Sequence, residues 1–312
     1  MRVRSLDILE KGDICAIIVT YDGKAFISNT VKNVKKKVNH IVIIDNNSTD
    51  GTKEYLETIK STTLTVINNK KNYGIAHALN QGFEFAKRNG FFWVLTMDQD
   101  SSLSDNMIGE MSIVYNKLLN KDKVVCLAPK VVYSKKDGFK KTYHKEFYEK
   151  TAVITSGSLV KTQVFNEIGG FEEKLFIDSV DFDFCLKLKE RGYKILICNN
   201  ATMLHSLGEI RRVKMLNRDI IIHIHPSIRK YYMSRNYIYI MNKYFINHTC
   251  FCLKMSLFYL IFILQTVIYE KKVISNLKII LEGISDGIRG NFGEKLDLKI
   301  NWKVGFLWRG TC

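Results

Sequence analysis

Short apolar, β-branched runs alternate with segments of helical periodicity over about the first hundred residues of the chain. Continuous apolar runs bounded by polar turns predict strands, and apolar residues that recur every three to four positions predict helices. The predicted strands are residues 14–21, 40–45, 63–68 and 91–97, and the predicted helices are residues 25–37, 52–60 and 75–88. Apolar strands separated by helices predict an α/β fold, a mostly parallel sheet with helices on both faces.

The remainder of the chain changes character twice. Residues 182–191 have helical spacing, and residues 193–199 form another apolar run typical of a strand. After residue 205 the sequence becomes basic and rich in aromatic residues. We therefore predict an α/β domain at residues 1–205 and a C-terminal helical region at residues 206–312.

Polar residues cluster where the predicted strands end. Thr20, Tyr21 and Asp22 follow the first strand, residues 45–50 follow the second, and residues 98–100 follow the fourth. Ligands of open α/β sheets bind beyond the carboxyl ends of the strands. We therefore expect these three clusters to form one ligand site.

Asp98 and Asp100 are separated by a single residue, Gln99. Two carboxylates at this spacing repel each other unless a cation or backbone N–H donors lie between them. A divalent ion is the favoured interpretation, because carboxylate and phosphate oxygens form the shell that Mg²⁺ or Mn²⁺ prefers. The alternative is a solvated turn followed by a serine that caps the next helix.

Two other segments have both a structural and a ligand-binding interpretation. Residues 45–52 contain Asn47, Ser48 and Asp50, which are residue types that cap helices as well as contact ligands. Residues 72–86 open a helix with small side chains, which allow either close approach of a ligand or tight packing of the helix on the sheet. Both interpretations stay open for each segment.

A second acidic cluster lies in residues 169–193. Asp178 and Asp181 are three residues apart, which predicts a shared helical face, whereas Asp183 points elsewhere. Stabilisation of negative charge by the start of a helix is one explanation for the cluster. The apolar residues between the acids favour a partly desolvated cleft, in which a carboxylate can act as a general base. His205 follows the next strand. A lone histidine is more often a structural or surface residue than a metal ligand, so its residue type alone indicates no function.

Composition and charge narrow the class of protein. The chain has 312 residues, of which 46% are hydrophobic and 25% charged, an ordinary globular balance. Its seven cysteines include no CxxC pair, and its first residues lack an apolar signal segment, so we expect a cytoplasmic protein with reduced thiols. The net charge is +16, and residues 206–312 hold 17 Lys and Arg against 7 Asp and Glu. This excess of positive charge favours an anionic partner, which could be a nucleotide, a nucleic acid or an acidic membrane surface.

Residues 250–272 are the most hydrophobic stretch of the chain. Their uncharged part, residues 255–269, is 15 residues long, which is shorter than the roughly 20 that a spanning helix needs. The stretch is then a core helix, a homo-oligomer contact or a helix in the membrane interface beside basic residues. We favour peripheral contact with the membrane surface over a spanning helix.

Taken jointly, these motifs resemble the family 2 inverting glycosyltransferases of the GT-A fold, and most closely a rhamnosyltransferase-like branch that acts on bacterial polysaccharides. The resemblance covers about residues 13–207. Each motif is weak alone, and their combination is specific. They are IIVTY (17–21), VIIDNNSTDGT (42–52), NYGIAHALNQGF (72–83), MDQDS (97–101), SGSLV (156–160), GGFEEKLFIDSVDFDFCLKLKERGY (169–193) and the later histidine.

The resemblance implies roles in metal binding and catalysis. Asp98 would face the ribose and the metal, Asp100 would bind the metal directly, and His205 would be a further ligand of the Mg²⁺ or Mn²⁺ cofactor. Asp181 would be the catalytic base, and Asp178 would hold or orient the acceptor.

The resemblance also implies a binding site for a nucleotide-sugar donor in the first domain. Thr20, Tyr21, Asp22 and Asp45 would border the base and ribose, with Asn47 and Asp50 nearby, and Gln99 would be a further substrate-binding residue. Those that would shape the diphosphate side are Asn72, Gly74 and Asn80. The chain departs from many relatives at Lys187 and Lys189, where an arginine is common, and this puts an anion contact there in doubt.

The implied function is transfer of L-rhamnose from dTDP-L-rhamnose, with inversion, to a lipid-linked O-antigen or capsular glycan at the inner face of the cytoplasmic membrane. A UDP-hexose or UDP-galactofuranose donor is the alternative. A nucleotidyltransferase would carry a glycine-rich basic loop after the first strand, which residues 19–26 lack. A nucleic-acid-binding protein would carry aromatic stacking motifs, and acids line the expected cleft instead, so we expect no nucleic-acid partner.

Overall fold

The computed structural model describes residues 9–132, 145–205, 209–215 and 218–295. The chain forms two compact units, one of Met1–Glu173 with Asp181–Ser206 and one of Lys174–Val180 with Leu207–Cys312. The predicted boundary at residue 206 falls on residues 206–208, which lie outside the described residues, so that boundary stays a prediction. Residues 174–180 belong to the C-terminal unit although they lie far from it in sequence.

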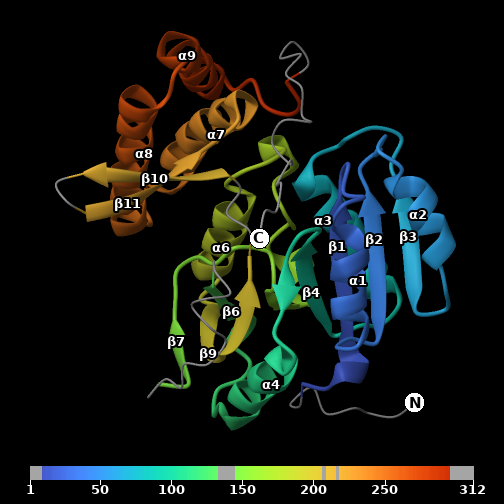
Figure 1. Ribbon diagram of the computed structural model, residues 1–312. Coiled ribbons are helices and arrows are strands. Elements are labelled where there is room, and N and C mark those ends of the chain that lie inside the picture. Colours follow the sequence, from blue (N-terminus) through green and yellow to red (C-terminus); the bar gives the residue numbers. More distant parts are fainter. Residues whose placement is uncertain (1–8, 133–144, 206–208, 216–217, 296–312) are drawn as a thin grey trace. The chain divides into compact units, whose positions relative to one another are not determined.

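The first unit is built on a nine-stranded mixed sheet (Figure 1). Its strands are β1 (Ile14–Thr20), β2 (His40–Asp45), β3 (Leu64–Asn68), β4 (Trp93–Asp98), β5 (Ser102–Leu103), β6 (Val124–Val132), β7 (Phe147–Glu149), β8 (Leu159–Lys161) and β9 (Lys194–Leu204). Its helices are α1 (Ile27–Lys35), α2 (Thr52–Ile59), α3 (Ile75–Arg88), α4 (Met107–Lys117), α5 (Val164–Glu167) and α6 (Val180–Glu190), whose first residue belongs to the other unit. Short 3-10 turns occur at Lys11–Asp13 and Glu173–Leu175.

The strand order is β3-β2-β1-β4-β8-β6-β9-β5, and β7 pairs with β9. β3, β2, β1 and β4 are parallel, β8 runs antiparallel between β4 and β6, and β6 is parallel to β9. The predicted mostly parallel sheet flanked by helices is confirmed. The strands and helices predicted in the first hundred residues are all present, with ends within two residues of the expected positions.

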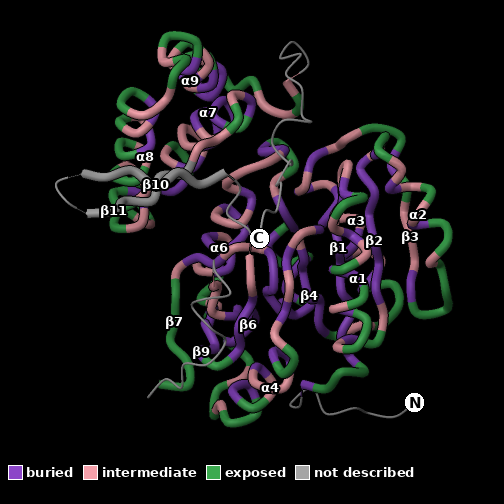
Figure 2. The backbone as a smooth tube through the Cα atoms, in the orientation of Figure 1, coloured by how far each residue is buried: buried purple, intermediate pink, exposed green. Residues whose placement is uncertain are grey.

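The central strand β1 is buried on both faces, which explains its continuous apolar sequence (Figure 2). Ala16 and Ile18 belong to a core that also contains residues of α1 and α4. Ile17 faces α3, where a Cβ added at Gly82 would lie 2.5 Å from the Ile17 Cγ2 atom. Helices therefore cover both faces of the sheet, and glycine at position 82 allows α3 to approach it closely.

The C-terminal unit contains an antiparallel hairpin and three helices. The hairpin is β10 (Glu209–Met215) with β11 (Arg218–Ile224), and the helices are α7 (Ser227–Tyr244), α8 (Thr249–Tyr269) and α9 (Val273–Arg289). The predicted helical extension is confirmed, whereas the hairpin was not predicted. α9 packs closely on α7, because a Cβ added at Gly283 would lie 2.4 Å from the carbonyl oxygen of Tyr231.

α8 corresponds to the hydrophobic stretch of the sequence, and it is longer than the uncharged run within it. The helix has 21 residues because Lys254 and the residues before it continue the same helix. By length and composition alone it is able to cross a membrane, which corrects the argument from the 15-residue run. Its three fully buried residues are Cys252, Phe262 and Thr266.

Candidate functional site

The candidate site lies where the chain order of the sheet reverses, between β1 and β4. β1 pairs in parallel with β2 on one side and with β4 on the other. Thr20, Asp45 and Asp98 are the last residues of these three strands. Since parallel strands end at the same edge of a sheet, the polar clusters expected at the strand ends share one edge.

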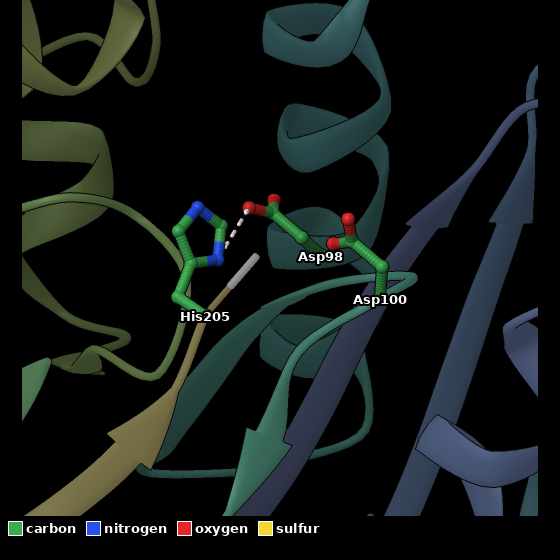
Figure 3. Close-up of side chains that lie close together, drawn as sticks. All are labelled: Asp98, Asp100 and His205. Carbon is green, nitrogen blue, oxygen red and sulfur yellow. Dashed lines mark ion pairs between the residues drawn. The ribbon is translucent and has the colours of Figure 1, made fainter. Parts of the chain in front are cut away.

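Asp98, Asp100 and His205 converge at this edge (Figure 3). One possible ligand atom from each side chain lies within 4.8 Å of the other two. The Nδ1 atom of His205 is 3.9 Å from Oδ2 of Asp98. His205 reaches the two acids because Leu204, the last residue of β9, pairs with Ser102 of β5 directly after them.

The group fits a divalent cation. Carboxylates and imidazole are common ligands of such ions, and metal–ligand bonds of about 2.0–2.6 Å allow one ion to join atoms at these separations. Asp98 and His205 keep 31% and 21% of their side-chain surface exposed, which leaves access for oxygen atoms of a bound substrate. A cation between Asp98 and Asp100 would also offset the repulsion between their charges.

Two buried serines support this group from behind. The Ser101 hydroxyl lies 2.9 Å from Nδ1 of His205. The Ser156 hydroxyl donates to Oγ of Ser101 over 2.9 Å and accepts the backbone N–H of Asp98 over 3.1 Å. Ser156 had no predicted role, and its place in the SGSLV motif was the signal that could have indicated one.

Gln99 joins the loops that follow β1 and β4. Its Oε1 atom accepts the Thr20 hydroxyl over 2.7 Å and the Tyr21 N–H over 2.9 Å, and its Nε2 atom donates to the Tyr21 carbonyl over 3.3 Å. A Cβ added at Gly23 would lie 2.3 Å from Oε1 of Gln99, so this loop requires glycine. Thr20 and Gln99, both expected to border the nucleotide, are buried and direct these polar atoms at the loop contact.

Asp22 and Asp50 link the β1 loop to the β2 loop. Asp22 accepts the Thr49 N–H over 2.7 Å, and Asp50 accepts the Lys24 N–H over 3.0 Å. Asp50 also accepts the N–H of Thr52, the first residue of α2, over 3.0 Å, but it is not the N-cap residue of this helix, which is Gly51. Burial opposes ionisation of Asp50, but the hydrogen bonds from Thr52 and Lys24 outweigh it and lower its pKa.

Asp45 is fully buried and organises the turn that follows β2. It accepts the backbone N–H of Ser48 over 3.0 Å and also the Ser48 hydroxyl, which in turn accepts the Asp22 N–H. Burial raises the pKa of Asp45, and the bonds from Ser48 partly oppose that shift. Asn47 adopts φ 67°, and its side-chain oxygen accepts Lys53. Ser48 thus stabilises Asp45 rather than capping the helix.

The residues expected on the diphosphate side lie at two places on α3. Asn72 accepts the N–H of Gly74, which has φ 86° and begins the helix. The buried Asn46, which no sequence pattern indicated, donates to the Gly74 carbonyl over 3.0 Å. Asn80 lies further along α3, where it exchanges hydrogen bonds with the backbone of Phe171. Ala76 and Ala78 are fully buried, in agreement with the packing interpretation for the small residues.

Asp181 is the second residue of α6 and is partly buried. It lines a small cavity together with Thr96, Thr155 and Cys185, among other residues. Thr96 lies two residues before Asp98 on β4. The cavity therefore connects Asp181 with the strand that ends in the candidate metal site, in a partly desolvated setting as the sequence predicted.

The other two acids of this cluster have different surroundings. Asp183 is fully buried and paired with Lys187 at 2.9 Å. Asp178 precedes α6, has φ 65° and forms an ion pair with Arg229 at 3.0 Å. The prediction that Asp178 and Asp181 share a helical face was wrong, because the helix begins only at Val180.

Lys187 and Lys189 make internal contacts. Lys187 donates to the Gly170 carbonyl over 3.1 Å in addition to its pairing with Asp183. Lys189 pairs with Glu149. These contacts argue against an anion contact at either position, since both ammonium groups already have partners.

Comparison with known proteins identifies the family. The family model for glycosyl transferase family 2 matches residues 15–177, which is more than half of the chain. The chain belongs to glycosyl transferase family 2 and is therefore a glycosyltransferase. The family resemblance of the motifs is confirmed.

Two individual proteins are informative. The dTDP-rhamnosyl transferase RfbF of Shigella flexneri is 28% identical over 297 residues, 90% of this chain and 97% of that protein, which supports the rhamnosyltransferase-like branch. The crystal structure of GalNAc-T7 with UDP, GalNAc and Mn²⁺ aligns with a TM-score of 0.53 at 17% identity. That alignment covers 67% of this chain and only 45% of the GalNAc-T7 chain, and it supports the fold alone.

The loop contact made by Gln99 leads to a stability prediction. Gln99→Met keeps the length of the side chain but removes the amide, so Thr20 and Tyr21 lose this partner inside the protein. The free energy of unfolding should fall by about 1–3 kcal/mol, measured by urea denaturation. Gln163→Met, at an exposed position, is the control. Equal denaturation midpoints for the two variants would contradict the role of Gln99.

Proposed function

We propose that this glycosyltransferase transfers L-rhamnose from dTDP-L-rhamnose, with inversion, to a lipid-linked O-antigen or capsular glycan. The observation that carries the proposal is the convergence of Asp98, Asp100 and His205 at the carboxyl edge of the sheet. The choice of donor is supported by similarity to a dTDP-rhamnosyl transferase over 90% of the chain.

In this proposal Asp98, Asp100 and His205 hold Mg²⁺ or Mn²⁺. The ion supplies positive charge that offsets the charge developing on the leaving diphosphate. The base and ribose lie against the loops that follow β1 and β2, which include Tyr21 and Asp22. The segment from Asn72 to the start of α3 borders the diphosphate, where the N-terminus of a 14-residue helix favours negative charge.

Asp181 is the catalytic base in this proposal. It accepts the proton of the acceptor hydroxyl while that oxygen forms a bond to the anomeric carbon of the donor. The bond from the anomeric carbon to the diphosphate oxygen breaks on the opposite side, so the configuration inverts and dTDP leaves with the bonding electrons. Asp178 orients the acceptor, and partial burial of Asp181 favours its role as a general base.

A donor panel tests the reaction. Purified protein is incubated with dTDP-rhamnose, UDP-hexoses or UDP-galactofuranose, together with a membrane-lipid extract as acceptor, and released nucleoside diphosphate is measured. We expect release from dTDP-rhamnose that requires Mn²⁺ or Mg²⁺ and stops with EDTA. Release from a UDP-sugar alone would overturn the choice of donor. Release that is unaffected by EDTA would overturn the metal site.

Substitutions in the two acidic sites should have separable effects. Asp181→Asn should lower turnover by about 10²–10⁴-fold and leave Mn²⁺-dependent dTDP binding within twofold, because the base is removed and the metal site is kept. Asp100→Asn should weaken that binding at least tenfold, measured by calorimetry. Asp105→Asn changes a fully exposed carboxylate near the same loop and is the control. Normal turnover by Asp181→Asn would exclude this residue as the base.

The proposal also places the protein at the inner face of the cytoplasmic membrane, in contact with anionic lipid. Large apolar side chains line the face of α8 opposite its buried residues, where they recur every three to four positions. They are Leu253, Leu257, Phe258, Leu260, Ile261, Leu264, Val267 and Ile268. Exposed lysines at positions 254, 271 and 272 and the positive charge of residues 206–312 complement acidic headgroups.

Flotation with phosphatidylglycerol-containing vesicles tests this contact. Replacing Leu257 and Phe258 together by Glu should reduce the bound fraction at least tenfold, since each apolar side chain contributes about 1.5–3 kcal/mol when buried. Leu119→Glu changes a fully exposed leucine of the other unit and should have no effect. If the double variant binds vesicles normally but has half the native mass in light scattering, α8 is a contact between copies of the chain and the membrane assignment is wrong.

A further inference from the structure

The segment that leads into α6 has an unusual backbone. Phe176, Asp178 and Ser179 have φ of 62°, 65° and 60°, in the left-handed region that residues with a side chain rarely adopt. Such conformations persist only where surrounding contacts hold them, and they concentrate at functional sites.

Asn236, a fully buried residue of α7, contacts the backbone of this segment at three points. Its side-chain Nδ2 atom lies 3.0 Å from the carbonyl oxygen of Leu175, 2.7 Å from that of Ile177 and 2.8 Å from that of Asp178. The two N–H groups of one amide thus serve three carbonyls across four residues. These carbonyls are fixed relative to one another as well as to α7.

Arg235, the neighbouring residue, holds the beginning of the segment. Its guanidinium donates to the carbonyl oxygens of Lys174 over 3.2 Å and Leu175 over 2.9 Å, and it lies over the ring of Tyr232 at 4.8 Å. Only 1% of Arg235 is exposed. Burial of a charged group is costly unless its donors are satisfied, so this arrangement strongly favours one backbone conformation.

Two more contacts from α7 complete a clamp on residues 174–178. The clamp consists of Arg229, Tyr232, Arg235 and Asn236. Tyr232 stacks on Phe176, the first residue with positive φ, with ring centroids 5.3 Å apart. Arg229 pairs with the carboxylate of Asp178 at 3.0 Å, and half of the Arg229 side chain is exposed. Every one of these contacts lies within the C-terminal unit.

We propose that Asn236, Arg235 and Arg229 are positioning residues for the catalytic base. The inference rests on the proposed function, in which Asp181 is that base. Asp181 follows Asp178 by three residues in the chain and is the second residue of α6, so the conformation of residues 176–179 sets the start of the helix that carries it. A base must lie within hydrogen-bond reach of the acceptor hydroxyl, and a displacement of about 1 Å can cost 10²-fold in rate.

The three α7 residues lie outside the part of the chain that matches the family model, which ends at residue 177. In this proposal the C-terminal unit affects the rate of the reaction. It acts through the chain segment that it holds, and it requires no contact of α7 with donor or acceptor.

The test compares Asn236→Ala with Asn242→Ala, a change at an exposed position of the same helix. Turnover is measured at saturating donor and acceptor, and the affinity and stoichiometry of Mn²⁺-dependent dTDP binding are measured by calorimetry. We expect kcat of Asn236→Ala to fall 10- to 100-fold while the number of dTDP sites and their Kd stay within twofold. Asn242→Ala should match the wild type in all three quantities.

A loss of kcat that is matched by an equal loss of dTDP sites would overturn the inference, because it would show that Asn236 only supports folding. If Asn236→Ala does not fold, Arg229→Gln decides, since it removes an exposed side chain and one contact of the clamp. This variant should lose about threefold to tenfold in kcat with dTDP binding unchanged, and wild-type kcat would overturn the inference.

Asp181→Asn is measured in parallel. It distinguishes failure of the positioning role from failure of the proposed function. If Asp181→Asn is inactive while Asn236→Ala and Arg229→Gln turn over normally, the positioning role of the clamp is wrong and the proposed function stands. If Asp181→Asn turns over normally, the assignment of the base is wrong, and the positioning role fails with it.

Discussion

The side-chain amide of Gln99 is the contact on which the candidate site depends. It ties the end of β4 to the residues that follow β1 by three hydrogen bonds, at the boundary between β1 and β4 where the strand order reverses. With Gln99 turned inward, the flanking residues Asp98 and Asp100 are directed toward the ligand side of the sheet. The residue that joins the two loops therefore lies between the two acids in the chain.

The acids of this edge divide into two groups by their partners. Asp22 and Asp50 accept backbone N–H groups from each other's loops, and Asp45 accepts one from its own turn, so their charge holds these loops in place. Asp98 and Asp100 instead converge on an imidazole, and a cation is the natural partner for such a set. Loops stabilised in this way can present a metal site without relying on the metal for their own structure.

The C-terminal unit combines an interior rich in polar contacts with an apolar outer surface. Arg235 and Asn236 are buried in α7, where their donors meet backbone carbonyls of residues 174–178, while α8 leaves a row of large apolar side chains exposed. Buried polar groups that are satisfied fix one conformation more strictly than apolar packing does, because any other conformation leaves them without partners. The C-terminal unit can therefore hold residues 176–179 in a strained conformation and also expose an apolar face of α8 for binding.

The sequence by itself determined the α/β order, the ends of the first strands and helices within two residues, and the place of the acids at strand ends, because local periodicity and residue type carry that information. Tertiary structure alone decided that His205 joins Asp98 and Asp100, since this depends on the pairing of β5 with β9. It likewise decided that Gln99 faces inward, that Asp178 precedes α6, and that α7 holds the segment before Asp181. These are contacts between residues far apart in sequence, and no local pattern records which distant partner a polar side chain will meet.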